Sequence, residues 1–448
     1  MGGSGAGSEQ TVPMIGWAYL VVSVNGAAYT LNAWRPTRRN PLLWTWGFFA
    51  SWLTIELAPF HLIWQIVATA LFVRKGALKT TQGKVGLAIT VASWVGLVMS
   101  VRESWAARAE IKDALRDLSA GERAEQQLPV RTEKRIVYGR AAGNNLRLDV
   151  HSPDVPIHGE LKRPALIQIH GGGWVLGFKA YQGQMLMKRM ARRGWVCFNI
   201  DYRLSPAATW PDYLVDVKRA IAWVRDHAEQ YGVDPGFIAV TGGSAGGHLT
   251  ALTALTQNDP AYQPGFEDAD TSVVAAVPFY GVYDMTNRKG ASPKEMQTLL
   301  LAPWVFKADM ADAAEAYAAA SPIDQVREDA PPFFVIHGRT DIVAPVEDAR
   351  DFVEGLRSVS EQPVYYLELK GAQHAFDTFP SIRSNPVVES AARFLAAVYT
   401  AYVEGPGWVA EPEEVIQYVE GELGEELAEE LVKDVEEIEL EEIEESLD

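Results

Sequence analysis

The chain has 448 residues, with 48% hydrophobic residues and 14 tryptophans, which excludes a globally disordered protein and leaves room for about two or three domains. Its single cysteine, Cys197, excludes an internal disulfide framework and a cysteine-based zinc site, and its apolar neighbours predict a buried strand thiol. The net charge of −18 comes from residues 404–448, which hold nineteen acidic residues and one lysine; the rest of the chain holds 39 of each sign. A neutral body argues against nucleic-acid binding, which needs a basic face.

The first 101 residues have the composition of a membrane region. Residues 1–14 are expected to form a flexible N-terminus without a removable signal peptide, since no basic segment precedes the first apolar run. Three apolar tracts follow between residues 15 and 101, at 15–33, 42–73 and 85–101. The third tract has no charged residue and is close to the roughly 20 residues that cross a bilayer.

The second tract is too long for one upright span, and it carries Glu56, Pro59 and His61 near its middle. A kinked tilted helix, a re-entrant hairpin, or an interfacial half followed by a true span would each fit. We therefore expect about two to four membrane segments in residues 15–101.

Basic residues between the tracts favour this membrane region over a buried helical cap of a soluble protein; they are Arg35, Arg38, Arg39, Arg74, Lys75, Lys79 and Lys84. If the second tract crosses once, these loops lie on opposite sides and the positive-inside rule does not set the orientation. If it forms a hairpin, both loops are cytoplasmic and the rest of the chain lies outside. We expect a cell-membrane protein with its catalytic domain on the outer face.

Residues 102–130 are predicted to form a charged linker helix, and residues 131–403 have an α/β texture. Strand-like runs alternate with helical patterns from residue 165 on, which predicts a mostly parallel sheet covered by helices on both faces. The runs are 135–138, 146–151, 165–170, 196–201, 237–241, 273–279, 333–337 and 364–369. The first two flank a Gly-Asn-Asn turn and predict a hairpin at the sheet edge. Residues 404–448 are expected to form an acidic amphipathic helix.

One predicted strand, Phe237–Thr241, runs into Gly242-Gly243-Ser244-Ala245-Gly246, a G-x-S-x-G sequence followed by a helical pattern. This is the sequence form of a nucleophile elbow, in which a serine sits on a tight strand-to-helix turn. Ser244 is the candidate nucleophile. A mere glycine turn is the competing interpretation, so the serine needs partners elsewhere in the chain.

The first partner is His170-Gly171-Gly172-Gly173-Trp174, directly after another predicted strand. Glycines here leave backbone N–H groups free to face a ligand, as an oxyanion hole requires. Gly171 and Gly172, with the N–H of Ala245 after the serine, are the candidate oxyanion donors. His170 precedes the serine and is expected to hold the loop.

The base and acid are expected in the chain order Ser, Asp/Glu, His. Among the eight histidines, His374 alone combines that order with a loop after a strand, so it is the candidate base. Asp341, just beyond strand 333–337, is the candidate acid that fixes the histidine tautomer. Asp348 and Asp351 compete with it, but both fit better on the exposed face of the next helix.

With these motifs, residues 130–403 resemble the α/β-hydrolase fold and, within it, the hormone-sensitive-lipase-like esterases, also called bacterial family IV. The glycine loop, the Asp201-Tyr202-Arg203-Leu204 segment and the elbow carry the resemblance, although Gly243 stands where that family usually has Asp. Gly338-Arg339-Thr340-Asp341 is closer to related esterases and exopeptidases. An N-terminal membrane region is not typical of that family, which builds part of its substrate cap from the N-terminus.

The resemblance implies a serine carboxylesterase or lipase that hydrolyses small or lipid-like acyl esters through an acyl-enzyme, without a metal or organic cofactor. Two alternatives stay open: an exopeptidase or amidase on the same scaffold, and a catalytically silent fold that recruits partners. The segment 285–320 carries Met296, Leu299, Leu300, Trp304 and Phe306, which either line an acyl pocket under a lid or pack as an ordinary helix. The sequence leaves the acyl chain length and the oligomeric state open.

Overall fold

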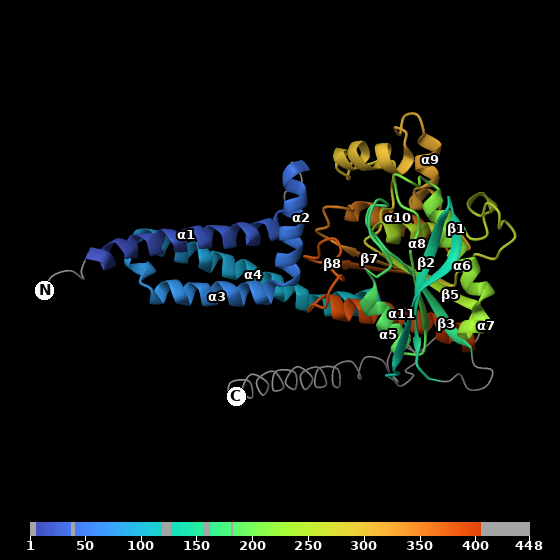
Figure 1. Ribbon diagram of the computed structural model, residues 1–448, viewed down its shortest axis with the longest axis horizontal. Coiled ribbons are helices and arrows are strands. Elements are labelled where there is room, and N and C mark those ends of the chain that lie inside the picture. The colour runs from blue at the N-terminus through green and yellow to red at the C-terminus, as the bar shows by residue number, and fades with distance from the viewer. Residues whose placement is uncertain (1–5, 37–40, 119–126, 156–161, 181, 405–448) are drawn as a thin grey trace.

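The computed structural model describes residues 6–36, 41–118, 127–155, 162–180 and 182–404. The amphipathic helix predicted for residues 404–448 lies, beyond Glu404, outside these residues. Figure 1 shows an elongated arm of helices joined to a β-sheet that carries helices on both faces. One helix of the arm, α2 (Pro41–Glu56), stands across the junction between the two parts.

The sheet has eight strands in the order β1-β2-β4-β3-β5-β6-β7-β8. β1 pairs antiparallel with β2, and β2 pairs antiparallel with β4; the other neighbours are parallel. All eight predicted strands, the edge hairpin and the mostly parallel sheet are confirmed. The strands are β1 (Val130–Ala141), β2 (Asn144–Pro153), β3 (Arg163–Ile169), β4 (Val196–Ile200), β5 (Val233–Gly243), β6 (Ala275–Phe279), β7 (Phe333–Gly338) and β8 (Val364–Leu369).

The central strands are buried on both faces, as expected for a parallel sheet between two helical layers. One apolar core joins the sheet to α6 (Asp212–Asp226), α8 (Ala245–Leu255) and α10 (Val346–Val359). The other core joins it to α5 (Gln184–Arg192) and α11 (Ser384–Glu404). Shorter helices are α7 (Ala228–Tyr231), η2 (Pro260–Tyr262), α9 (Ala314–Ala319) and η4 (Pro322–Asp324).

The arm consists of α1 (Ala6–Trp34), α3 (Ala58–Arg74), the short η1 (Ala77–Lys79) and α4 (Thr81–Ala114). Residues 6–14, expected to be a flexible N-terminus, form the first turns of α1. The second apolar tract is divided at Leu57, where the axes of the residues 47–56 of α2 and of α3 differ by 89°. Of the three arrangements considered for this tract, an interfacial half followed by a span fits best, because α2 lies across the arm and α3 runs along it.

The arm has its small and polar residues inside and its large apolar residues outside. Gly86 of α4 packs against Tyr19 and Ser23 of α1, and Thr30 and Ser93 join the same helices by a 2.8 Å hydrogen bond. Large side chains face outward, among them Trp17, Val21, Ile63, Trp64, Val67, Leu71, Val95 and Met99. This is the packing expected of membrane helices, which place small and polar residues between helices and apolar side chains toward lipid.

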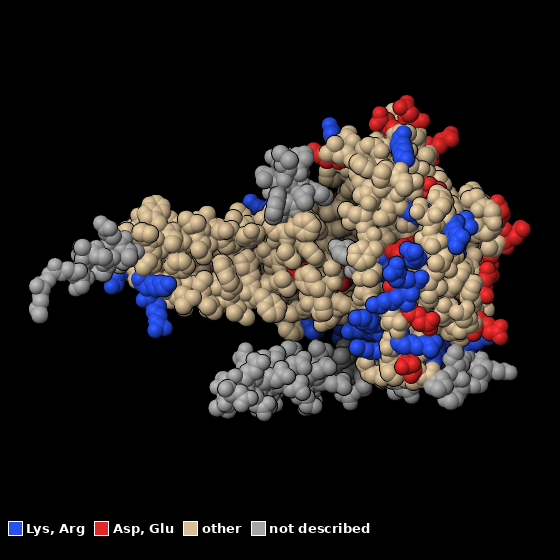
Figure 2. Space-filling view, viewed as in Figure 1, with Lys and Arg blue, Asp and Glu red and all other residues tan. Residues whose placement is uncertain are grey.

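Two arm helices, over Val12–Trp34 and Thr81–Ala114, are long and apolar enough to cross a membrane, and the bent pair α2–α3 would add a third. Figure 2 shows a face of the arm almost without charged side chains, with basic residues at its far end. The arm therefore associates the protein with a membrane. A buried cap of a soluble protein would have its apolar side chains covered.

Helix α4 continues without a break from the arm into the sheet part of the molecule. No separate linker helix begins at residue 102 in the described chain, since α4 runs from Thr81 to Ala114. Its last turns join the core formed with α5 and α11, where Ala107 is fully buried. The carboxylate of Glu110 accepts a hydrogen bond of 3.1 Å from the backbone N–H of Lys370, after β8. One helix thus connects the apolar arm to the sheet edge.

Candidate active site

Ser244 lies on the turn between β5 and α8 with φ 60° and ψ −123°. A non-glycine residue in this conformation is strained by about 1–3 kcal/mol, and such strain is typical of a nucleophile elbow. The turn closes only because its flanking residues are glycines: a Cβ on Gly246 would lie 2.0 Å from the carbonyl oxygen of Ile169. The Ser244 N–H donates to the carbonyl of Phe279 (3.0 Å), which fixes the turn against β6.

The structure brings the three predicted residues Ser244, His374 and Asp341 into one hydrogen-bonded chain. The Nε2 atom of His374 lies 2.8 Å from the Ser244 hydroxyl oxygen, and its Nδ1 atom lies 2.7 Å from Oδ2 of Asp341. His374 follows β8 and Asp341 follows β7, so all three residues lie at the carboxyl edge of the sheet. This edge is where open α/β sheets bind their ligands.

The Asp341 carboxylate is fully buried and held by the backbone. Its Oδ1 atom accepts hydrogen bonds from the N–H groups of Val343 (2.8 Å) and Ala344 (2.9 Å), which leaves Oδ2 for the histidine. The competitor Asp348 was predicted to be exposed on α10, and this is wrong. Asp348 is 4% exposed because the segment after β6 covers that face of α10, and burial raises its pKa to about 7.

The predicted oxyanion loop lies directly beside the elbow. A Cβ on Gly171 would approach within 3.0 Å of the Ser244 Cβ and 2.5 Å of the Gly243 carbonyl, so only glycine fits there. Gly172 and Gly173 have φ values of +122° and +60°, which favour glycine. Among the described residues, nothing accepts a hydrogen bond from the N–H of Gly172, Gly173 or Ala245. Three donors are therefore free beside the serine.

Gly171 itself is a different case. Its N–H donates a 2.6 Å hydrogen bond to Oε1 of Gln182, so it is not free to bind an oxyanion. The prediction of Gly171 as a donor is corrected by this contact, and Gly173 offers an N–H in its place. Gln182 holds the loop from eleven residues further along the chain, and no local pattern in the sequence marks it.

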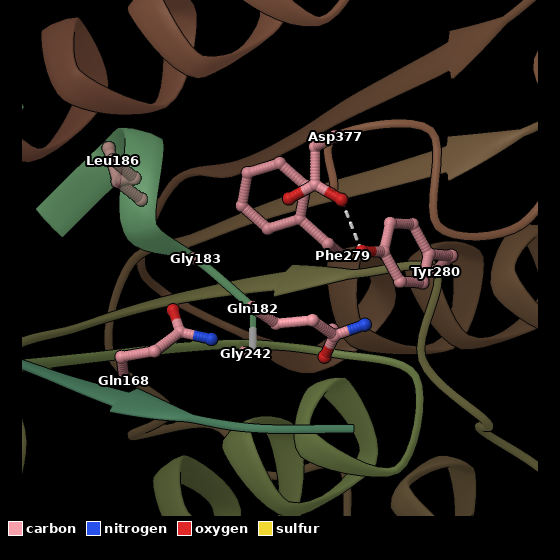
Figure 3. Close-up of a pocket in the computed structure, with 9 residues that line it drawn as sticks. Gln168, Gln182, Gly183, Leu186, Gly242, Phe279, Tyr280 and Asp377 are labelled. Carbon is pink, nitrogen blue, oxygen red and sulfur yellow. Dashed lines mark hydrogen bonds between the residues drawn. The ribbon is translucent and has the colours of Figure 1, made fainter. Parts of the chain in front are cut away.

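A small pocket lies behind the elbow, between the end of β5, the start of α5 and the residues after His374 (Figure 3). Gln168 and Gln182 line one side of it, and Asp377 points across to the hydroxyl of Tyr280, which donates a short hydrogen bond. Burial raises the pKa of Asp377, and the Tyr280 hydroxyl opposes that shift. The Tyr280 ring packs on the His374 imidazole, with 4.7 Å between ring centres. Tyr280, which lines this pocket, thus packs directly against the histidine.

The remaining histidines near the elbow have structural contacts. His170 is buried, stacks on Tyr202 and hydrogen-bonds the carbonyl of Gly171, in agreement with a role in holding the loop. His248 is buried beside Trp174 and bonds the carbonyl of Ala320, and burial lowers its pKa to about 4. Among the described residues, no group of three or more His, Cys, Asp or Glu side chains could hold a metal ion.

The segment predicted to be either a lid or an ordinary helix contains the π-helix η3 (Met296–Phe306). Leu300 lies next to the glycine loop, since a Cβ on Gly173 would be 3.5 Å from its side chain. Met296 and Phe306 pack on the core, whereas Leu299 and Trp304 are exposed. The segment thus packs on the core, and Leu300 lies beside the glycine loop of the candidate site.

A serine on a strand–helix turn of a mostly parallel sheet, bonded to a histidine after the last strand, defines an α/β-hydrolase. A family model described as BD-FAE matches residues 148–356. The chain is 41% identical over 419 residues to the probable carboxylic ester hydrolase LipM of Mycobacterium tuberculosis, covering 86% of this chain and 94% of that protein. It is 47% identical over 265 residues to the esterase LipQ of the same organism, covering 59% and 62%.

Solved structures agree. The butyrate-bound esterase Est2 of Thermogutta terrifontis has 27% identity and a TM-score of 0.50, over 64% of this chain and 97% of that one. A truncated carbohydrate esterase from gut microbiota, at 23% identity and a TM-score of 0.52, shares the fold over 62% of this chain and 100% of its own. The chain belongs to the hormone-sensitive-lipase-like carboxylic ester hydrolases, and it is a serine esterase.

Proposed function

We propose that Ser244, His374 and Asp341 are the catalytic triad of this esterase and that it hydrolyses apolar acyl esters at a membrane. The observation that carries the proposal is the hydrogen-bonded chain from the Ser244 hydroxyl through His374 to the buried Asp341. No other histidine among the described residues bonds both a serine hydroxyl and a carboxylate.

In the proposed mechanism, the Ser244 hydroxyl oxygen attacks the ester carbonyl while His374 accepts its proton. Asp341 holds the imidazole in the tautomer that has its proton on Nδ1 and stabilises the imidazolium that forms. The N–H groups of Gly172, Gly173 and Ala245 are placed to stabilise the oxyanion, each donor contributing about 3 kcal/mol. His374 then protonates the leaving alcohol, and water, activated by the same histidine, hydrolyses the acyl-enzyme.

The surroundings of Ser244 support an apolar acyl group. Leu300 lies beside Gly173 of the glycine loop, and Leu176 (60% exposed) adds apolar surface beside Gly172. The butyrate found in Est2 is consistent with a short acyl chain in this fold.

The arm is proposed to cross the membrane with α1, α3 and α4. Its far end carries four basic residues and no acidic residue between Arg74 and Lys84, against three basic residues between Trp34 and Pro41 at the other end. These counts differ by one residue, so the positive-inside rule does not set the orientation, and we propose that the esterase domain lies on the outer face. Labelling a cysteine introduced at exposed Ser358 in intact cells with a membrane-impermeant maleimide tests this; protection until lysis would reverse the orientation.

The triad is tested with the purified full chain on p-nitrophenyl esters of two to twelve carbons and on an aminoacyl anilide. Ser244→Ala and His374→Ala are each expected to lower kcat by at least about 10⁴-fold. Ser358→Ala is the matched control, since this exposed hydroxyl bonds only within α10. Turnover that survives Ser244→Ala would refute the triad, and a preference for the anilide would instead identify an exopeptidase.

A further inference from the structure

Helix α2 of the arm lies directly against the residues that carry His374. These residues, 370–383, connect β8 to α11 and are named the histidine loop here. Phe48 of α2 approaches the His374 ring edge to face, with 6.3 Å between ring centres, and Phe48 stacks on Trp52 one turn later. The catalytic histidine is therefore packed between Tyr280 of the sheet domain and an aromatic pair of the arm.

Gln373 ties α2 to both catalytic loops. Its Nε2 atom donates to the Ser51 hydroxyl of α2 at 3.1 Å. Its Oε1 atom accepts from the N–H of Ile342 (2.9 Å), next to Asp341, and from the N–H of His374 (3.1 Å). Gln373 and Ser51 are fully buried, so water cannot replace a lost partner at low cost. One amide side chain thus sets the distance between the acid loop, the histidine loop and α2.

Trp52 holds the other side of the same histidine. Its indole N–H donates to the carbonyl of Ala375 at 3.1 Å. Ala375 has φ +59°, a conformation that a non-glycine residue adopts only when its surroundings hold it there. Since Ala375 directly follows His374, the bond from Trp52 fixes the strained peptide that sets the direction of the imidazole.

The end of α2 is anchored to the same loop by a buried ion pair. Arg383 and Glu56 are paired with side chains that are both fully buried, and the Ser381 hydroxyl donates to Glu56 at 2.8 Å. Along the histidine loop, Ser51 therefore contacts Gln373, Trp52 contacts Ala375, and Glu56 contacts Ser381 and Arg383 at its end. The contacts join positions more than 300 residues apart.

We propose that α2 is a positioning element of the esterase site, in which Ser51 and Trp52 hold His374 in line between Asp341 and Ser244. The membrane region is then part of the catalytic unit as well as its anchor. The proposal rests on the proposed function, because it assigns α2 to the histidine of that triad. Ser51 and Trp52 touch neither the substrate nor the reacting atoms and act through Gln373 and Ala375.

The test uses the full chain in detergent and p-nitrophenyl acetate, a substrate too small to need a large acyl site. A fluorophosphonate probe titrates the fraction of molecules with a reactive Ser244. Ser51→Ala and Trp52→Phe are each expected to lower kcat per titrated site by roughly 10-fold and their combination by about 100-fold, because a 1 Å misplacement costs on the order of 100-fold. KM should stay within about twofold. Ser51→Thr, which keeps the hydroxyl, should restore most of the rate.

Two matched controls make the same chemical changes elsewhere in the arm. Trp17→Phe alters an exposed indole of α1, and Ser100→Ala removes a hydroxyl that bonds only within α4. Both are expected to keep the parent rate. The proposal would be overturned if kcat per titrated site stayed unchanged in Ser51→Ala and Trp52→Phe. The same holds if these variants lost only the fraction of molecules that react with the probe. Neither result would contradict the assignment of the triad. A wrong assignment of the triad would be recognised separately, because the Ser244→Ala variant would then still hydrolyse the substrate.

Discussion

The buried pair Glu56–Arg383 gives a prediction about stability. The change is Glu56→Gln, which keeps the shape of the side chain and removes its charge. The Arg383 side chain is fully buried, and among the described residues its Nε atom and one Nη atom have no hydrogen-bond partner. Glu56 is therefore its main source of charge compensation, with Glu103 of α4 as a second carboxylate that interacts with it electrostatically.

Removal of one partner from a buried ion pair costs about 3–5 kcal/mol, because the other charge stays buried and uncompensated. Glu103 remains in the variant, so we expect the lower end, about 3 kcal/mol. For a domain of this size, roughly 2–4 °C of Tm correspond to 1 kcal/mol, which gives a decrease of about 6–12 °C. The double change Glu56→Leu and Arg383→Met should be less destabilised than either single change, since no charge is left buried.

The assay is thermal unfolding of the detergent-solubilised full chain, followed by tryptophan fluorescence. Glu389→Gln is the matched control, since Glu389 pairs with Arg189 and Arg193 at the surface with its side chain 30% exposed. A surface pair contributes about 1 kcal/mol or less, so this variant should lose no more than about 4 °C. Equal Tm decreases for the two variants would refute the reasoning that burial of Arg383 decides the cost.

Three further predictions concern the site and its surroundings. Asp341→Asn should keep the fold and lower kcat by about 10⁴-fold with little change in KM, because the amide favours the wrong tautomer of His374; steady-state kinetics with p-nitrophenyl acetate checks this. Asp348→Asn should stabilise the protein at pH 8 by up to about 4 kcal/mol, since the pKa of Asp348 is raised to about 7. A raised carboxyl pKa makes the folded state bind more protons than the unfolded state between about pH 4 and 7, so the gain in stability should vanish at pH 4. Urea unfolding midpoints at pH 4 and pH 8 measure this gain. An equal gain at both pH values would contradict the raised pKa of Asp348. Leu300→Trp should lower kcat/KM for the octanoate ester by at least about 10-fold relative to the acetate ester, and equal losses would show that η3 does not line the acyl site.

The sequence predicted the parts of the molecule that local patterns encode. Most strands contain a short apolar run, and Ser244, Asp341 and His374 each follow such a run in the order of the fold. Parallel strands bring their carboxyl ends to one edge, so position along the chain was enough to group the three residues.

The errors and omissions concern contacts that no local pattern encodes. Gly171 was taken for an oxyanion donor because the sequence does not show that Gln182 folds back onto its N–H. Asp348 lies on a helix whose polar face is covered by the segment after β6, and Lys289 of that segment pairs with Asp351. The contacts of Ser51 and Trp52 with the histidine loop join two parts of the chain whose sequences give no sign of each other.

If α4 crosses the membrane as proposed, its continuity sets how far the esterase domain stands from the bilayer. At about 1.5 Å per residue, its 34 residues span about 51 Å, of which the hydrocarbon core takes about 30 Å. About 20 Å remains as a rigid stem that ends in the core of the domain, without a flexible linker among the described residues of α4. The catalytic edge is consequently held at a fixed height and tilt above the lipid, so a thicker or thinner membrane would change which depth of the bilayer the site can draw substrate from.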